Sequence, residues 1–547
     1  MAKANCLTMA ARFVAQGPTF GGWDAGGLLA CRPRAPVPTT SMLGIAAPAR
    51  TAGRSRSARA GRCYIVLRSM ERVPPDLLLI SDVHLGAHLK PRGRGEFVHL
   101  KDHVDRAFAR FVDHYLRASR PGGLQLVVNG DFIDFWNVEV AADVTDPEAR
   151  AVARLHAVLD EYPGVEEALV RLLERGDGVV FVVGNHDAEF LYPKVREALV
   201  ARLEGAAHPD EASRSATRTG VVRLDALGEG RVRFVRWFLH EPGGVWIEHG
   251  HKFDPTCATP AALSPTRGGR LVPTVAEVAT RSFANLVPEI DHDAPDHMSG
   301  LDYVRWALAR GGRFTMRCVL LYLRMAGRIL SLGLRGGRAD RLGRKTHEAL
   351  LERIARNANL QMSTLMALER MAPPPATATV AGVMSVVALD LILAAVLPVV
   401  VAATIAFASG LPVAYGTAAG LVVSALAVAV LLRGRTRRDV AAKMTTVASD
   451  VGRTVGVPLV LMGHSHRGQL DLVDGVLYAN SGSFLDGTHL YVQRDRTGRL
   501  ARVSLRRFRN GGVTELRSAP VPAPATQTVT PPSMEAQGLA PSDAVAG

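Results

Sequence analysis

LLLISDVHLG, residues 77–86, is the stretch that decides the fold of this chain. Four consecutive apolar residues predict a buried β-strand, and Asp82 and His84 follow directly after its end. Similar short apolar runs recur as LQLVVNG, VVFVVG, VWIEHG, PLVLMG and VLYANSG, and helical stretches lie among them. Buried strands combined with helices predict an α/β fold, in which functional residues lie in the loops beyond the strand ends.

Residue types that bind metal ions follow five of these predicted strands. They are Asp82 and His84 in LLLISDVHLG, Asp131 and Asp134 in LVVNGDFIDFW, Asn185, His186 and Asp187 in FVVGNHDAEF, His249 and His251 in WIEHGHKFDP, and His464 and His466 in LMGHSHRG. Each group alone is weak evidence, because a single Asp or His is commonly structural. Buried together without a metal, so many carboxylates and imidazoles would suffer large desolvation costs. The combination therefore predicts a metal centre where the strand ends converge.

The ordered series D-x-H, G-D-x-x-D, G-N-H-D, H-G-H and G-H-x-H resembles the calcineurin-like metallophosphoesterase superfamily. The resemblance covers about residues 76–254 and 457–507. It implies a double β-sheet sandwich flanked by helices, with two metal ions at the strand ends. The long segment between the two parts departs from the compact form of the family, so its role does not follow from the resemblance.

The resemblance also implies roles for individual residues. Seven are implied as metal ligands: Asp82, His84 and His466 for the first ion, Asn185, His249 and His464 for the second, and Asp131 as a bridge between both. Mixed carboxylate, amide and imidazole ligands suit Mn²⁺, with Fe or Zn²⁺ as alternatives. A hydroxide shared by two cations is a strong nucleophile near neutral pH, so we expect hydrolysis of a phosphoester or pyrophosphate bond.

Two further residues are expected to act in catalysis. His186 resembles the family's catalytic histidine, which protonates the leaving oxygen, and Asp134 resembles the carboxylate that orients it. For Asp134 and Asp187 the alternative is a capping role within the loops. His251 is expected to support the ligands rather than to bind a metal.

Between residues 258 and 456 the alternation of predicted strands and helices stops. This expected helical insertion contains two apolar runs, 379–410 and 413–432, each long enough for the about 20 residues that span a bilayer. Asp390 is the only formally charged residue in both runs, so we expect a transmembrane hairpin. A buried hairpin of a soluble core is the alternative. Arg-rich flanks on both sides predict that the catalytic domain faces the cytoplasm.

The amphipathic stretch Met316–Arg335 either lies on the anionic membrane surface or packs against its own protein. His292 and His297, in the loop DHDAPDH, are expected in a solvated lid or membrane-proximal loop rather than in another metal site, because no apolar strand presents them.

The two ends of the chain lack a folding pattern. Residues 1–70 are rich in Ala, Arg, Gly and Pro and predict a disordered basic leader, with a transit peptide or a start at Met70 as alternatives. Residues 516–547 are rich in Pro and Ala and predict a disordered tail. The phosphoesterase domain is thus expected in two parts, 71–257 and 457–515.

The formal net charge of +14 favours anionic partners. Much of the excess lies in the leader and around the apolar runs, so membrane lipids are the expected partner and nucleic acid is not. Five widely spaced cysteines without a CxxC pair argue against a cysteine zinc knuckle and favour a reducing compartment.

These observations predict a membrane-anchored phosphoesterase, located at a bacterial inner membrane. The blocks ISDVHLG, GDFIDFW and HGHKFD are similar to those of UDP-2,3-diacylglucosamine hydrolase-like bacterial phosphoesterases, which implies a lipid-linked substrate, and nucleotides are further candidates. The alternatives are a non-catalytic membrane scaffold that keeps the fold and a nucleic-acid phosphodiesterase. The complete set of ligand residues argues against the scaffold.

Overall fold

The computed structural model describes residues 74–87, 89, 96–140, 144–207, 231–242, 244–287, 289–290, 300–334, 341–434 and 440–523. The predicted leader, the loop with His292 and His297, and the tail beyond residue 523 lie outside these residues. The chain divides into two units, Met1–Met70 and Glu71–Gly547, and the description below concerns the second unit.

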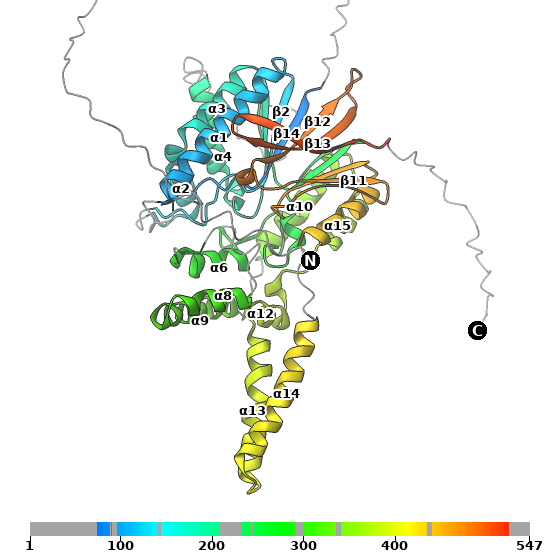
Figure 1. Cartoon of the computed structure of the whole chain (residues 1–547). Coiled ribbons are helices and arrows are strands. Elements are labelled where there is room, and N and C mark those ends of the chain that lie inside the picture. The colour runs from blue at the N-terminus through cyan, green and yellow to red at the C-terminus, as the bar shows by residue number, and fades with distance from the viewer. Residues whose placement is uncertain are drawn as a thin grey trace, which may run out of the picture. The chain divides into compact units, whose positions relative to one another are not determined.

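Two β-sheets form the centre of this unit (Figure 1). Their strands are β1 Asp76–Ile80, β2 Leu124–Asn129, β3 Gly178–Val182, β4 Val232–Val235, β5 Phe238–Glu241, β6 Val245–Glu248, β9 Leu459–Met462, β10 Gly468–Val473, β11 Val476–Ser481, β12 Thr488–Arg494, β13 Leu500–Arg509 and β14 Gly512–Pro520. The larger sheet has the order β14-β13-β12-β1-β2-β3-β4, and the smaller has the order β10-β11-β9-β6-β5. Strands β1 to β4 are parallel neighbours, and so are β6 and β9.

Side chains of the central strands alternate between two cores. In β1, Leu78 and Ile80 enter the core beneath the helices of the larger sheet. Leu77 and Leu79 enter a second core, to which the smaller sheet also contributes. Because successive residues of a strand point to opposite faces, an unbroken apolar run requires cover on both faces. The two sheets therefore pack face to face with helices outside, which confirms the expected α/β sandwich.

Helices cover the outer face of each sheet. The larger sheet carries α1 Glu96–Ala118, α2 Pro147–Glu161, α3 Pro163–Glu174 and α4 Pro193–Ala207 (Figure 1). The smaller sheet carries α10 Arg341–Asn357, α11 Met362–Met371 and α15 Val440–Val455. Leu350, Leu365 and Met444 from these helices share one core with Val460 and Tyr478 of the sheet. Part of the expected insertion is thus an integral layer of the sandwich.

A further group of helices lies between the sandwich strands β6 and β9 in sequence. It contains α6 Val275–Ser282, α8 Gly300–Ala309, α9 Gly312–Leu334 and α12 Val380–Val386, together with the short hairpin β7 Thr266–Arg267 and β8 Arg270–Leu271. Val275 of α6, Ile329 of α9 and Val383 of α12 meet in a small core of their own.

The two apolar runs form the helices α13 Leu389–Ala408 and α14 Val413–Gly434, which lie side by side (Figure 1). The first run is not one continuous helix, because Ala388 has a left-handed backbone with a φ of 50° and separates α12 from α13. Only 6% and 11% of the most apolar windows are buried, so neither helix is a core helix of the described fold. Both are long and apolar enough to cross a membrane.

The last strand extends past residue 515, where the sequence predicts the end of the folded domain. β14 runs to Pro520 and pairs antiparallel with β13. Most of its side chains are exposed, so it is held by its backbone ladder and carries no apolar alternation that a sequence pattern could reveal.

Candidate metal centre

Loops after five strands bring the predicted site residues together. Asp82, Asp131 and Asn185 follow the parallel neighbours β1, β2 and β3. His249 and His464 follow β6 and β9, which are parallel neighbours in the smaller sheet. Because parallel strands end on the same edge of a sheet, the side chains after them converge.

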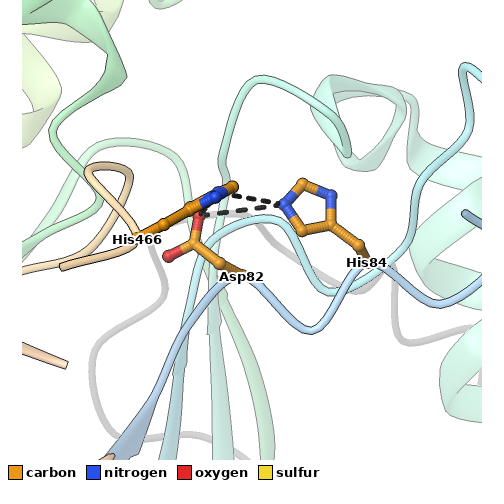
Figure 2. Close-up of side chains that lie close together, drawn as sticks. All are labelled: Asp82, His84 and His466. Carbon is orange, nitrogen blue, oxygen red and sulfur yellow. Dashed lines mark hydrogen bonds and ion pairs between the residues drawn. The ribbon is translucent and has the colours of Figure 1, made fainter. Parts of the chain in front are cut away.

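The first cluster consists of Asp82, His84 and His466, which Figure 2 shows pointing toward one another. His466 Nε2 lies 3.2 Å from Asp82 Oδ1 and 3.4 Å from His84 Nε2, and His84 Nε2 lies 3.9 Å from Asp82 Oδ1. Two ligand atoms that each stand about 2.1 Å from one cation lie roughly 3.0–3.4 Å apart. Two of the three distances fall in this range and the third, at 3.9 Å, is longer, so His466 stands at ligand spacing from both Asp82 and His84, although His84 and His466 are 382 positions apart in sequence.

The second cluster consists of Asp131, His249 and His464. His249 Nε2 lies 3.2 Å from Asp131 Oδ2. His249 Nδ1 lies 2.7 Å from the backbone carbonyl of Asn129. A carbonyl only accepts, so this contact places a proton on Nδ1 and leaves Nε2 as the ring nitrogen that faces the cluster.

Buried atoms with unused lone pairs indicate that these residues fit metal ions. Asp82 Oδ1, Asn185 Oδ1 and His249 Nε2 are buried, and none has a hydrogen-bond partner among the described residues. An unsatisfied buried polar group costs about 1–3 kcal/mol, and a bound cation would remove that cost. Oxygen and imidazole donors without a thiolate suit Mn²⁺, Fe or Zn²⁺.

The backbone is strained at the same positions. Five of the seven predicted ligands have a left-handed backbone, with φ values of 54° at Asp82, 49° at His84, 54° at Asp131, 66° at His464 and 55° at His466. Each such residue costs about 1–3 kcal/mol, and strain of this kind is concentrated at functional sites. Glycine is required beside them, because a Cβ at Gly184 would collide with the carboxylate of Asp131, and one at Gly130 would collide with the ring of His249.

His186 borders the first cluster. Its ring centroid lies 4.5 Å from that of His84, and the Trp136 indole stacks on it at 3.7 Å. Its Nδ1 lies 3.2 Å from Asp134 Oδ1. Burial would lower the pKa of His186, but the charges of Asp134 and Asp131 raise it above its usual value. The arrangement favours a protonated His186.

The carboxylate of Asp134 is itself held in place. The backbone N–H of Trp136 donates to Asp134 Oδ1 at 3.1 Å, and the side-chain amide of Asn137 donates to Oδ2. The same side chain thus caps its own loop and faces His186, so the two interpretations of Asp134 are compatible.

The pKa values of two buried carboxylates near the centre, Asp131 and Asp187, are shifted in opposite directions. Burial would raise the pKa of Asp131, but the charges of His249 and His186 hold it well below its usual range. For Asp187, burial and the charge of Asp131 raise the pKa to about 7. Asp187 accepts hydrogen bonds from the backbone N–H groups of Gly184 at 2.6 Å and Phe132 at 2.8 Å, which is the capping geometry.

The structure adds residues that the sequence analysis does not single out. Asp254 Oδ2 lies 3.7 Å from His464 Nε2, and both form a further group with Cys257. Asp254 stands in the block HGHKFD, so its position close behind two site histidines is the signal that could reveal it. The ring of His251 lies 5.5 Å from that of His249, and burial holds its pKa well below the usual value.

Comparison with known proteins agrees with this geometry. Residues 76–276 match the family described as calcineurin-like phosphoesterase, and this match includes the first four of the five blocks. This part of the chain is therefore a calcineurin-like phosphoesterase domain, and the protein is a metal-dependent phosphoesterase. His464 and His466 lie beyond the match, yet the fold brings them to residues inside it.

No curated protein matches the chain. Among solved structures, phosphopantetheinyl hydrolase from Mycobacterium tuberculosis is 13% identical over 75% of this chain and 90% of its own, with a TM-score of 0.20. A likeness at that TM-score carries no argument about the substrate.

Proposed function

We propose that this protein hydrolyses a phosphoester or pyrophosphate bond with two divalent cations. The observation that carries the proposal is the convergence of two ligand clusters, Asp82 with His84 and His466, and Asp131 with His249 and His464. Asn185, whose buried Oδ1 has no hydrogen-bond partner among the described residues, completes the proposed ligand set. Manganese is the proposed metal, because oxygen and imidazole ligands suit it.

Asp131 is the proposed bridge between the cations. Its two oxygens have different surroundings, since Oδ2 faces His249 at 3.2 Å while Oδ1 accepts a hydrogen bond from the backbone N–H of His186 at 2.8 Å. The bound cations would supply an ionised water as nucleophile and neutralise charge on the phosphate oxygens. Ionised Asp131 keeps its negative charge for this purpose, because its pKa is held low.

His186 is the proposed general acid. Asp134 at its Nδ1 orients the ring and favours its protonated form, so that His186 donates a proton to the leaving oxygen. The Trp136 indole, stacked on the imidazole, restricts its rotation and shields one face from water.

The test is hydrolysis of bis(p-nitrophenyl) phosphate and p-nitrophenyl phosphate by purified protein with added Mn²⁺. Asp131→Asn removes the bridging charge and should abolish the activity. Asp160→Asn, at an exposed carboxylate of α2, is the matched control and should keep it. A wild-type protein that binds Mn²⁺, Fe or Zn²⁺ but hydrolyses neither ester would instead support the scaffold alternative.

We also propose that α13 and α14 anchor the protein in a membrane, with the catalytic domain on the cytoplasmic side of a bacterial inner membrane. Their low burial supports this proposal. On α9, Met316, Leu320 and Leu323 are exposed beside Arg317 and Arg324, a combination that suits the surface of an anionic bilayer. A lipid-linked phosphate ester is the substrate class that this location favours.

Membrane fractionation tests the anchor. The protein should remain in the membrane pellet after a carbonate wash, since two apolar helices resist extraction at high pH. Release into the supernatant would contradict the hairpin but would leave the proposed hydrolysis untouched.

A further inference from the structure

A cavity of about 220 Å³ adjoins the metal centre. Trp136, Asn185 and His251 of the centre line one part of it. The rest is lined by residues of α2 and α6, by the segment around β7 and β8, and by residues of the stretches 188–192 and 257–262 together with Arg236. It is smaller than the roughly 300–1,000 Å³ pockets that hold drug-sized ligands, so it suits one small group.

The described lining of this cavity is strongly basic. It contains five arginines, Arg150, Arg154, Arg236, Arg270 and Arg281, and two carboxylates, Glu189 and Glu277. The excess of positive charge lies within a partly enclosed space, where the low dielectric strengthens its attraction for anions.

Arg281 is fixed in one position. Its Nε pairs with Glu277 at 2.8 Å, and its two terminal nitrogens donate to the backbone carbonyls of Trp136 at 3.1 Å and Phe135 at 3.2 Å. These carbonyls belong to the loop that carries Asp134. Arg281 therefore couples the cavity wall to the catalytic loop.

The guanidinium groups of Arg150 and Arg154 form fewer hydrogen bonds to the described residues than that of Arg281. They stand one turn apart on α2, so their like charges are neighbours on one helix face. The Nε atoms of both are buried without a hydrogen-bond partner among the described residues. Glu189 Oε1 is 3.9 Å from a terminal nitrogen of Arg154, too far for a hydrogen bond. Glu189 Oε1 also lies 3.9 Å from a terminal nitrogen of Arg281, so this one carboxylate is shared between two arginines and neutralises neither fully.

The pKa values of two residues on the cavity wall are shifted from their usual values. Burial and the neighbouring charges of Arg281 and Arg150 lower the pKa of Arg154. Burial and Glu277 raise the pKa of Glu189 to about 7, so Glu189 is partly protonated at neutral pH and compensates the arginines incompletely.

We propose that Arg150, Arg154 and Arg281 bind a second anionic group of the substrate while its scissile phosphoester occupies the metal centre. This inference rests on the proposed function and narrows it to substrates that carry two anionic groups. Guanidinium groups bind phosphate through paired N–H donors, so a second phosphate or phosphonate is the preferred occupant. The cavity admits this group alone, and the rest of the substrate lies outside it.

The experiment compares two diesters with the same scissile bond, p-nitrophenyl ethyl phosphate and p-nitrophenyl 2-phosphonoethyl phosphate. Binding to the Mn²⁺-loaded full-length protein is measured by calorimetry, and hydrolysis is followed by p-nitrophenol release. The wild type should bind the phosphonoethyl ester at least about tenfold more tightly, since two charge-assisted hydrogen bonds exceed the 1.4 kcal/mol that a factor of ten requires.

Arg150→Gln combined with Arg154→Gln should remove this preference, and Arg154→Lys should reduce it because lysine keeps the charge but loses the paired donors. Arg356→Gln, at an exposed arginine of α10, should retain it. Circular dichroism confirms that the variants fold.

Equal affinity of the wild type for both esters, or binding of neither, overturns the arginine pocket. A retained preference without hydrolysis of either ester supports the pocket and contradicts the proposed hydrolytic function, so the two failures are distinguishable.

Discussion

His186 Nδ1 stands 3.2 Å from Asp134 Oδ1, although the two residues come from loops that follow different strands. Two hydrogen bonds from Trp136 and Asn137 hold the carboxylate, and the indole of Trp136 holds the ring. The pair is therefore positioned before any substrate arrives. This rigidity is what a proton donor requires, because proton transfer depends on geometry first and on pKa second.

Replacing His186 should affect poor leaving groups most. His186→Gln should lower kcat by about 10²–10⁴-fold for an alkyl phosphate, because an alkoxide must be protonated as it leaves. For a p-nitrophenyl ester the loss should be much smaller, since p-nitrophenolate leaves without a proton. The ratio of the two losses is the readout, with manganese content measured on the same samples. An equal loss for both esters would exclude His186 as the general acid.

Asp134 should act through His186. Asp134→Asn should lower kcat for the alkyl phosphate, and adding His186→Gln should cause little further loss, because residues that act as a unit are not additive. Full additivity of the two losses would show that Asp134 serves its loop alone.

A substitution at Gly184 tests the close packing around Asp131. Gly184→Ala places a Cβ against the Asp131 carboxylate and should displace it, so manganese affinity should fall at least about tenfold. Gly205→Ala, in α4, is the matched control, since a Cβ there meets no atom of the described residues within 4 Å apart from its own helix backbone. The control should raise stability by about 0.5–1 kcal/mol through helix propensity. Unchanged metal affinity in Gly184→Ala would mean that Asp131 is not a ligand.

The raised pKa of Glu189 predicts that the free energy of unfolding depends on pH. Its pKa is raised to about 7 in the folded protein from a usual value of 4.5, so the folded state binds more protons between these values. Stability that Glu189 contributes below pH 4.5 is therefore lost as the pH rises toward 7. Glu189→Gln should be more stable than the wild type at pH 8, by about 1–3 kcal/mol, and should unfold with a flatter pH profile.

The comparison is made as a difference between wild-type and variant urea unfolding curves from pH 4.5 to 8. Asp187, whose pKa is also raised to about 7, titrates in the same range but is common to both proteins. A constant difference across this range would contradict the assignment.

Removing the hairpin separates anchoring from folding. Deleting α13 and α14 with a short linker between α12 and α15 should release the protein from membranes and spare hydrolysis of small soluble esters. Deleting residues 341–455 instead should abolish folding, because α10, α11 and α15 cover the smaller sheet. Loss of metal binding in the shorter deletion would show that the hairpin supports the site.

The sequence predicts those parts of the molecule that depend on neighbouring residues. An apolar run such as Leu77–Ile80 must be a covered strand, and the ligand types follow directly behind it. Relations set by packing are less accessible. The arginines of α2 meet Arg281 of α6 only in the folded chain, and no pattern near Arg150 indicates a cavity.

The break at Ala388 and the role of α10 show the same limit. Alanine favours helices, so the sequence predicts one continuous helix through Ala388. In the folded chain Ala388 has a left-handed backbone, and α12 before it packs against α6 and α9. Likewise, the apolar face of α10 predicts an amphipathic helix, but the sequence does not indicate which sheet this face covers.

The wide separation of His84 and His466 has a consequence for biosynthesis. The ribosome makes α13 and α14 before it makes His464 and His466. When the hairpin has been synthesised, the metal-ligand set is therefore still incomplete. A nascent or prematurely terminated chain therefore lacks two of its seven proposed ligands, and the order of synthesis keeps the hydrolytic centre unassembled until the hairpin has been completed.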